Sequence, residues 1–263
     1  MVLFPNCKIN VGLNIIRKRI DGYHDLETVF YPTKRTDALE IIEADRSNDE
    51  VQFTSSGLDI EVSLQNNLCF KAYQLIKKDF PDLPSVKMHL HKKVPIGAGL
   101  GGGSSDGAFT LKLLNQKFNL GLSTEKLLDY AIQLGSDCPF FIINKPCFAQ
   151  GRGEKLESIN LDLSSYQILI TNPQDVQINT AWAFSKIIPS LPAKPIKEII
   201  QQPVEMWRDE LKNDFEEVVF ERYPNIRKIK ENFYNAGAIY SSMSGSGSSI
   251  FAIFNKEAKI ELE

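Results

Sequence analysis

A glycine-rich segment, VPIGAGLGGGSSDGA (residues 94–108), holds the residues with the clearest capacity for chemistry. Glycine lets the backbone bend unusually or approach another group closely. Successive backbone N–H groups that lead into a helix start form a concave anion site, which the helix dipole makes more positive. The segment therefore predicts a phosphate-binding loop, and a tight packing turn stays open as the alternative. The predicted loop residues are Pro95, Gly97, Gly99, Leu100, Gly101, Gly102, Gly103, Ser104 and Ser105.

Known nucleotide-binding motifs do not account for this loop. Gly97, Gly99 and Gly102 satisfy the pattern G-x-G-x-x-G, which is weak evidence alone. A dinucleotide-binding motif requires an acidic residue about 20 residues later, at the end of a second strand. This chain has LGLSTEKLL there, which is typical of a helix start. A Walker loop would require Gly-Lys-Ser/Thr, and a protein kinase would require HRD and DFG, none of which the sequence contains.

A lysine and an aspartate far apart in the chain are candidates for proton transfer. Asp137 follows a predicted helix end in GSDCPFF, and Lys8 shares a strand face with Asn10. An aspartate in this position most often caps the next helix, here with Pro139 in the first turn. A lone lysine on a strand is usually solvated. Both ordinary interpretations stay open beside a catalytic one.

Periodic patterns predict the elements that position these residues. Strict alternation in KINVGLNII (residues 8–16) predicts a strand with one buried face, and Asp21-Gly22 predicts a turn into a second strand. Helical spacing predicts a helix over 67–80 and another over 124–134. Ser104 and Ser105 are expected to cap a third helix, directly after the glycine loop. Further strands are expected at 85–94 and 166–173, with a strand–turn–strand unit over 238–254.

The order of elements indicates the fold class. Strands and helices mix without regular βαβ alternation, which favours an α+β fold. A fresh strand begins after residues 155–165, so we expect two domains, 1–158 and 159–263.

Composition and charge narrow the class of protein. The 263 residues are 43% hydrophobic and 24% charged, which is typical of a globular protein. We find no apolar run that could span a bilayer and no signal-peptide profile. The net charge of −3 disfavours nucleic-acid binding, and the four cysteines lack metal-site spacing. We expect a cytoplasmic enzyme with a small-molecule substrate and with neither a nucleic-acid nor a membrane partner; oligomeric state and metal ligands stay unknown.

Several stretches together resemble a known family. PNCKINVGLNI, PIGAGLGGGSSDGA and SSMSGSGSSIFAIF are similar to segments of the GHMP small-molecule kinases. RKRIDGYHDLETVF, LGSDCPFF and NDFE resemble the branch that phosphorylates 4-diphosphocytidyl-2-C-methyl-D-erythritol in non-mevalonate isoprenoid biosynthesis. The resemblance implies a two-domain α+β fold with ATP and substrate in the inter-domain cleft, and it implies ATP and Mg²⁺ as cofactors. It further implies that Asp137 accepts the proton of the acceptor 2-hydroxyl, with Lys8 as its partner.

The same resemblance implies roles on the substrate side. Tyr23 and Phe184 would enclose the cytosine ring, and His24 would hydrogen-bond its edge. Gly151 and Gly153, in FAQGRGEKL, would allow close backbone approach. Asn10 and Thr180 complete the implied substrate residues. Asn67 matches a position near the nucleotide base, although helix capping explains it equally well.

The chain also departs from the family pattern. Asp106 and Gly107 follow the two serines, where the family more often has Asn and Ala. A carboxylate near phosphates is unfavourable unless Mg²⁺ or a backbone cap compensates it. Two alternatives stay open: another GHMP kinase, acting on mevalonate-type, homoserine or sugar substrates, and a non-catalytic nucleotide-binding protein.

Overall fold

The computed structural model describes residues 1–44, 50–60, 62–173 and 176–260. The chain forms two compact units, each assembled from separate segments. Unit 1 contains Met1–Lys8, Pro32–Ile96 and Gly101–Lys145; unit 2 contains Ile9–Tyr31, Gly97–Leu100 and Pro146–Glu263. The single boundary expected near residue 158 stays a prediction.

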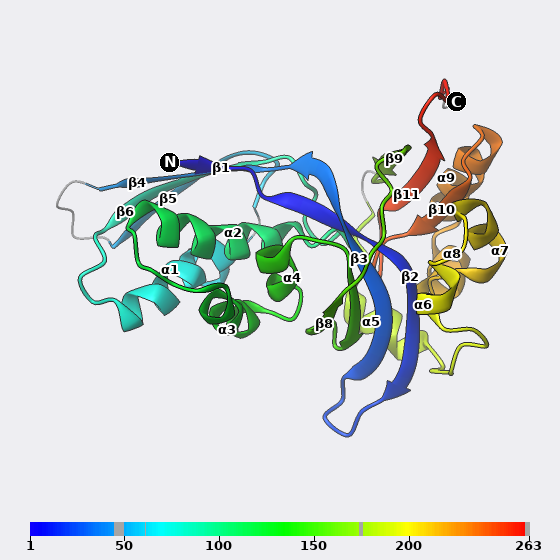
Figure 1. Cartoon of the computed structure of the whole chain (residues 1–263), viewed down its shortest axis with the longest axis horizontal. Coiled ribbons are helices and arrows are strands. Elements are labelled where there is room, and N and C mark those ends of the chain that lie inside the picture. Colours follow the sequence, from blue (N-terminus) through cyan, green and yellow to red (C-terminus); the bar gives the residue numbers. More distant parts are fainter. Residues whose placement is uncertain (45–49, 61, 174–175, 261–263) are drawn as a thin grey trace. The chain divides into compact units, whose positions relative to one another are not determined.

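Unit 1 is a sheet with helices packed on one side (Figure 1). Its strand order is β1 (Val2–Leu3), β4 (Ala38–Glu43), β6 (Val86–Lys92), β5 (Val51–Gly57). β5 and β6 are parallel because α1 carries the chain between them, and the other pairs are antiparallel. The helices are α1 (Leu68–Asp79), α2 (Gly102–Lys117), α3 (Thr124–Leu134) and α4 (Cys138–Ile143). Alternate residues of β6 and the inner faces of the helices form the buried core.

Unit 2 contains two sheets and the remaining helices. One sheet has the order β2 (Asn6–Lys18), β3 (His24–Thr36), β7 (Cys147–Gly151), β8 (Lys155–Ser158), and the ends of β2 and β3 belong to unit 1. The other sheet has β11 (Ile250–Asn255) between β10 (Tyr240–Met243) and β9 (Tyr166–Thr171). The helices are α5 (Thr180–Lys186), α6 (Ile196–Ile199), α7 (Trp207–Glu210), α8 (Phe215–Arg222) and α9 (Pro224–Asn235). Aromatic and aliphatic side chains from α5, α8, α9 and β11 share one core.

The predicted elements are confirmed, with two corrections. The strand over 8–16 is part of β2, but both of its faces are buried through Leu13, so it does not have one solvent-facing side. The helix after the glycine loop begins at Gly102, with Gly101 as its N-cap. Ser104 and Ser105 therefore lie inside the first turn and do not cap the helix. Ser123 caps α3 as predicted, since its hydroxyl accepts a hydrogen bond from the Lys126 amide.

Two further observations concern the chain as a whole. None of the helices within the described ranges combines the length and apolar character needed to cross a membrane. All four cysteines are buried free thiols.

Candidate active site

The glycine loop alternates left-handed and ordinary backbone. Gly97, Gly99 and Gly101 have φ values of 68°, 78° and 68°. An L side chain is disfavoured at such angles, so glycine is needed at every second position of this stretch. Gly97–Leu100 belongs to unit 2, and the loop from Gly101 onward belongs to unit 1.

Gly99 is also needed for packing. A Cβ atom there would lie 1.9 Å from the carbonyl oxygen of Ser244, in the turn between β10 and β11. The Ser244 hydroxyl donates to the Gly99 carbonyl (2.8 Å), and the Ser249 amide donates to the Ala98 carbonyl (3.1 Å). The packing-turn interpretation thus holds for this half of the loop.

The other half of the loop opens into α2. Gly101 ends the loop in the left-handed conformation, and α2 continues for 16 residues. The N–H groups of a first helical turn have no partner within the helix and attract anions. A Cβ on Gly103 would meet nothing within 4 Å, so the backbone there is open to close approach. The Ser105 hydroxyl is buried and has no hydrogen-bond partner within the described residues, and the Ser104 hydroxyl contacts the thiol of Cys138.

Lys8 and Asp137 come together beside this helix start. The Lys8 Nζ lies 3.7 Å from Asp137 Oδ2, and the Lys8 side chain is 4% exposed while that of Asp137 is 31% exposed. A Cβ on Gly101 would lie 3.3 Å from Lys8 Cε, so the loop glycine leaves space for the lysine. Burial lowers the pKa of Lys8, and the negative charge of Asp137 opposes that shift.

The ordinary interpretations of these two residues are wrong. Lys8 is buried rather than solvated. Asp137 stands at the N-cap position of α4, with proline in the first turn as expected, but its side chain makes no capping hydrogen bond. The carboxylate is therefore available for another task, with an ammonium group close by.

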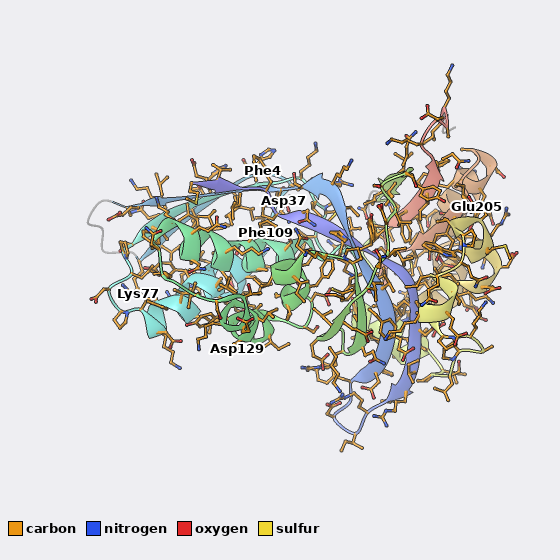
Figure 2. The ribbon with its side chains drawn as sticks, viewed as in Figure 1. Phe4, Asp37, Lys77, Phe109, Asp129 and Glu205 are labelled. Atoms are coloured by element: carbon orange, nitrogen blue, oxygen red, sulfur yellow. The ribbon has the colours of Figure 1, made fainter. Side chains whose placement is uncertain are left out.

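A second buried lysine lies under the first turn of α2. Lys92 Nζ donates to Asp106 Oδ2 (2.7 Å) and forms a short hydrogen bond with Asp37 Oδ2. The other oxygen of Asp37, just before β4 (Figure 2), accepts the Val94 amide (2.8 Å). Burial raises the pKa of Asp106 to about 7, although Lys92 favours the charged form. A lysine, which the sequence did not suggest, thus lies beside this carboxylate.

A small cavity adjoins the same helix start. It has a volume of about 130 Å³. Five of its lining residues are aliphatic, the polar members are Asn66, Asn67, Lys92 and Asp106, and Gly103 also lines it. Asn67 caps α1, as its Oδ1 accepts the Cys69 amide (2.8 Å), so the capping interpretation is confirmed and the residue also faces the cavity. An apolar cavity beside a helix N-terminus suits a planar base that carries phosphates.

Aromatic residues of unit 2 form a separate cluster. His24 stacks on Phe184 with centroids 4.9 Å apart, and Phe184 contacts Phe215 edge-on. Tyr23 is 56% exposed, and the guanidinium of Arg152 lies over its ring. Burial, with a smaller contribution from Lys18, lowers the pKa of His24, so its imidazole is neutral at pH 7 and can both donate and accept. In the structure the His24 ring thus lies against the face of the Phe184 ring. Enclosure of cytosine by Tyr23 and Phe184 stays a prediction.

The remaining predicted substrate residues are dispersed in unit 2. Asn10 is buried, and its Nδ2 donates to Thr28 Oγ1 (3.0 Å). Thr180 begins α5, and its hydroxyl is 3.0 Å from that of Ser246. Gly151 and Gly153 both have positive φ. Close approach of the substrate to their backbone stays a prediction.

Comparison with known proteins identifies the family. The model for the GHMP kinases N-terminal domain matches residues 67–145, and the model for the GHMP kinases C-terminal domain matches residues 195–262. A 4-diphosphocytidyl-2-C-methyl-D-erythritol kinase of Bacteroides fragilis is 52% identical over 99% of this chain and 94% of its own length. The chain belongs to the GHMP kinase family. A kinase of the same name from Cytophaga hutchinsonii is 48% identical over 97% of this chain and 93% of its own length.

Solved structures agree with the fold of this GHMP kinase. A crystal structure of 4-(cytidine 5'-diphospho)-2C-methyl-D-erythritol kinase matches with a TM-score of 0.82 at 27% identity, covering 96% of this chain and 90% of that one. The Methanococcus jannaschii mevalonate kinase matches with a TM-score of 0.70 at 14% identity, covering 98% and 92%. The second match supports the fold alone. The α+β fold of the GHMP kinases is thus confirmed.

Sequence reasoning missed Lys92 and Asp37 of the kinase. The period-two pattern contained the signal for Lys92, because Val86, Met88, Leu90 and Lys92 all point to the buried face of β6. A lysine on that face requires a buried anion. Asp37 could not be found this way, since it lies in the short link between β3 and β4.

Proposed function

We propose that this GHMP kinase uses ATP to phosphorylate the 2-hydroxyl of 4-diphosphocytidyl-2-C-methyl-D-erythritol. The curated relatives that carry this name at 45–52% identity over nearly the whole chain support the substrate. The observation that carries the chemistry is the pair of Lys8 and Asp137 against Gly101, at the start of α2. A protein that only binds nucleotide has no need of a carboxylate and a buried ammonium there.

The nucleotide side of the proposal rests on unit 1. The base of ATP would occupy the cavity beside Asn67, and the first turn of α2 would bind phosphate through its N–H groups. The loop residues proposed for ATP are Pro95, Gly97, Gly99, Leu100, Gly101, Gly102, Gly103, Ser104 and Ser105. Of these, Gly97, Gly99 and Leu100 belong to unit 2. Gly103, with open space at its Cβ position, would allow the phosphates to approach the backbone.

Mg²⁺ fits these residues as an ion that arrives with ATP. The described ranges contain no group of three or more His, Cys, Asp or Glu that could hold a metal. Mg²⁺ usually needs few protein ligands when phosphates and water supply the rest. Ser104 and Ser105, the latter with an unpartnered buried hydroxyl, would hold it beside the phosphates. When bound, the ion neutralises the charge that develops on the phosphate oxygens.

The transfer step needs a proton acceptor and an orienting charge. The acceptor hydroxyl oxygen would form a bond to the γ-phosphorus, the bond from that phosphorus to the β,γ-bridging oxygen would break, and ADP would leave. The hydroxyl proton would pass to the carboxylate of Asp137. Lys8, at 3.7 Å, would orient that carboxylate and stabilise its charge.

The acceptor side of the proposal rests on unit 2. The cytosine ring would bind at Tyr23, His24 and Phe184, and a neutral His24 can donate to or accept from the ring edge. Asn10, Gly151, Gly153 and Thr180 are the other proposed substrate residues. A cytoplasmic location and domains at 1–158 and 159–263 also belong to the proposal; the four buried thiols agree with a reducing compartment.

The test is ADP release by purified protein with Mg²⁺ and ATP. The acceptors are 4-diphosphocytidyl-2-C-methyl-D-erythritol, methylerythritol phosphate, mevalonate, homoserine and galactose. We expect turnover with the cytidylated acceptor alone. Turnover with another member of the panel would keep a GHMP kinase but reject this substrate, and binding of ATP without any turnover would favour the non-catalytic alternative.

A further inference from the structure

We propose that Arg152 binds the diphosphate of the acceptor while its guanidinium rests on the ring of Tyr23. This inference rests on the proposed function, because it takes the acceptor to be a cytidine diphosphate derivative. It adds a specificity residue that the sequence did not predict. All of the contacts involved lie within unit 2.

The turn between β7 and β8 holds Arg152 in a fixed position. Gly151 and Gly153, on either side, have φ values of 71° and 107°. The carboxylate of Glu154 accepts the Arg152 amide (2.6 Å), and the Gly153 amide donates to the Gln150 carbonyl (3.1 Å). A Cβ on Gly151 would lie 2.8 Å from Glu154 Oε1, so glycine is required for the carboxylate to fold back. The turn therefore fixes the backbone and presents the arginine side chain outward.

The arginine side chain lies over one ring face of Tyr23. β7 pairs with β3 so that Gly151 is opposite Leu26, which brings the turn beside the start of β3. The guanidinium carbon of Arg152 lies 4.9 Å from the Tyr23 ring centroid. An arginine stacked in this way keeps donors along its edge. Since Tyr23 is more than half exposed, a second planar group can still bind to it.

The charges nearby distinguish Arg152 from its neighbours. Arg17 donates to Asp25 (2.5 Å), and Arg19 forms ion pairs with Asp21 and Asp25. Arg152 has no ion-pair partner in the part of the chain that the structure describes. Its positive charge acts on Asp21 without forming an ion pair, and Asp21 is already paired with Arg19. The Arg152 guanidinium can therefore still bind an anion beside the aromatic residues proposed for cytosine.

A diphosphate fits this position chemically. In a cytidine diphosphate derivative the two phosphates follow directly from the nucleoside, so a cation beside the base-stacking ring is suitably placed to bind them. The planar guanidinium can bind two phosphate oxygens through two parallel N–H groups, a fixed geometry that the ammonium of Lys18 does not offer. Lys18 is the other candidate cation, since its charge acts on His24.

The experiment compares ligands with and without phosphate. Binding of cytidine, cytidine monophosphate and cytidine diphosphate is measured by calorimetry for the wild type and for Arg152→Gln. Arg17→Gln is the matched control, because it removes an exposed arginine that is already paired. We expect Arg152→Gln to weaken diphosphate binding about tenfold, as for loss of one hydrogen bond to a charged group, and to leave cytidine binding unchanged. The KM for the cytidylated acceptor should rise, with kcat and the KM for ATP unchanged.

Three results would overturn the inference. If Arg152→Gln bound cytidine and cytidine diphosphate more weakly by the same factor, Arg152 would only support the ring of Tyr23. Lys18→Gln is measured in the same way, and weaker diphosphate binding in this variant but not in Arg152→Gln would assign the diphosphate to that lysine. Normal binding of all three ligands by Arg152→Gln would remove the residue from the site. By contrast, a wild type that binds no cytidine ligand and does not phosphorylate the cytidylated acceptor would reject the proposed function itself.

Discussion

Replacing Asp106 with asparagine should change how the stability of the protein depends on pH. Asp37 and Asp106 share the single ammonium of Lys92 where water hardly reaches. Burial raises the pKa of Asp106 to about 7. Asparagine keeps an oxygen acceptor for Lys92 and leaves one ammonium with one carboxylate.

The magnitude follows from the raised pKa. The folded protein keeps a proton on Asp106 from about pH 3.8, where the free carboxyl titrates, to about pH 7. The stabilisation linked to this proton is complete below pH 3.8. It decreases steadily as the pH rises above 3.8 and is lost once the pH has passed through 7. Each pKa unit corresponds to about 1.4 kcal/mol, and Asp106 is half titrated at pH 7. The wild type should therefore lose about 2 kcal/mol between pH 5 and pH 7 that Asp106→Asn does not lose.

Urea unfolding at pH 5, 6, 7 and 8 measures this difference. The free energy of unfolding of Asp106→Asn, minus that of the wild type, should increase by about 2 kcal/mol from pH 5 to pH 7. Asp129→Asn is the control, because Asp129 is exposed on α3 (Figure 2), and its curve should run parallel to the wild type. A constant difference between Asp106→Asn and the wild type would refute the account of this buried group.

Two further variants test the two buried lysines and their partners. Lys92→Met should reduce the free energy of unfolding by about 3–5 kcal/mol, since it leaves two buried carboxyls without a cation. Urea unfolding beside the exposed neighbour variant Lys93→Met measures this, and equal losses would contradict it. Asp137→Asn should lower kcat about 10²–10⁴-fold, because the proton acceptor is lost, while ATP affinity is unchanged. Steady-state kinetics and ATP titration measure this, and turnover like that of the wild type would remove Asp137 from catalysis.

Local patterns in the sequence were sufficient to predict most helices and strands of the fold. Alternation over 85–94 and helical spacing over 124–134 correspond to β6 and α3, because both depend on neighbours only a few residues apart. The burial of both faces of β2 could not be predicted in this way. It depends on segments hundreds of residues away, such as the turn that contains Ser244, which binds the Asn10 amide.

Only those parts of the candidate site whose geometry depends on residues adjacent in the sequence could be predicted. The glycine loop was identified because its residue types are unusual, and the left-handed angles of Gly97, Gly99 and Gly101 give the reason for them. The Lys8–Asp137 contact joins residues 129 positions apart, so only the family resemblance suggested it. The prediction that Ser104 and Ser105 cap the helix was wrong. The N-cap is Gly101, in the left-handed conformation, which lies three residues before Ser104.

The most direct measurement of the central claim is the ³¹P NMR spectrum of a completed reaction. Purified protein is incubated with Mg²⁺, ATP and 4-diphosphocytidyl-2-C-methyl-D-erythritol as the sole acceptor. The account predicts one new phosphate monoester signal on the acceptor, with its diphosphate signals retained and ADP formed in equal amount. ADP accompanied only by inorganic phosphate, or loss of the acceptor's diphosphate signals, would contradict phosphoryl transfer to its hydroxyl group.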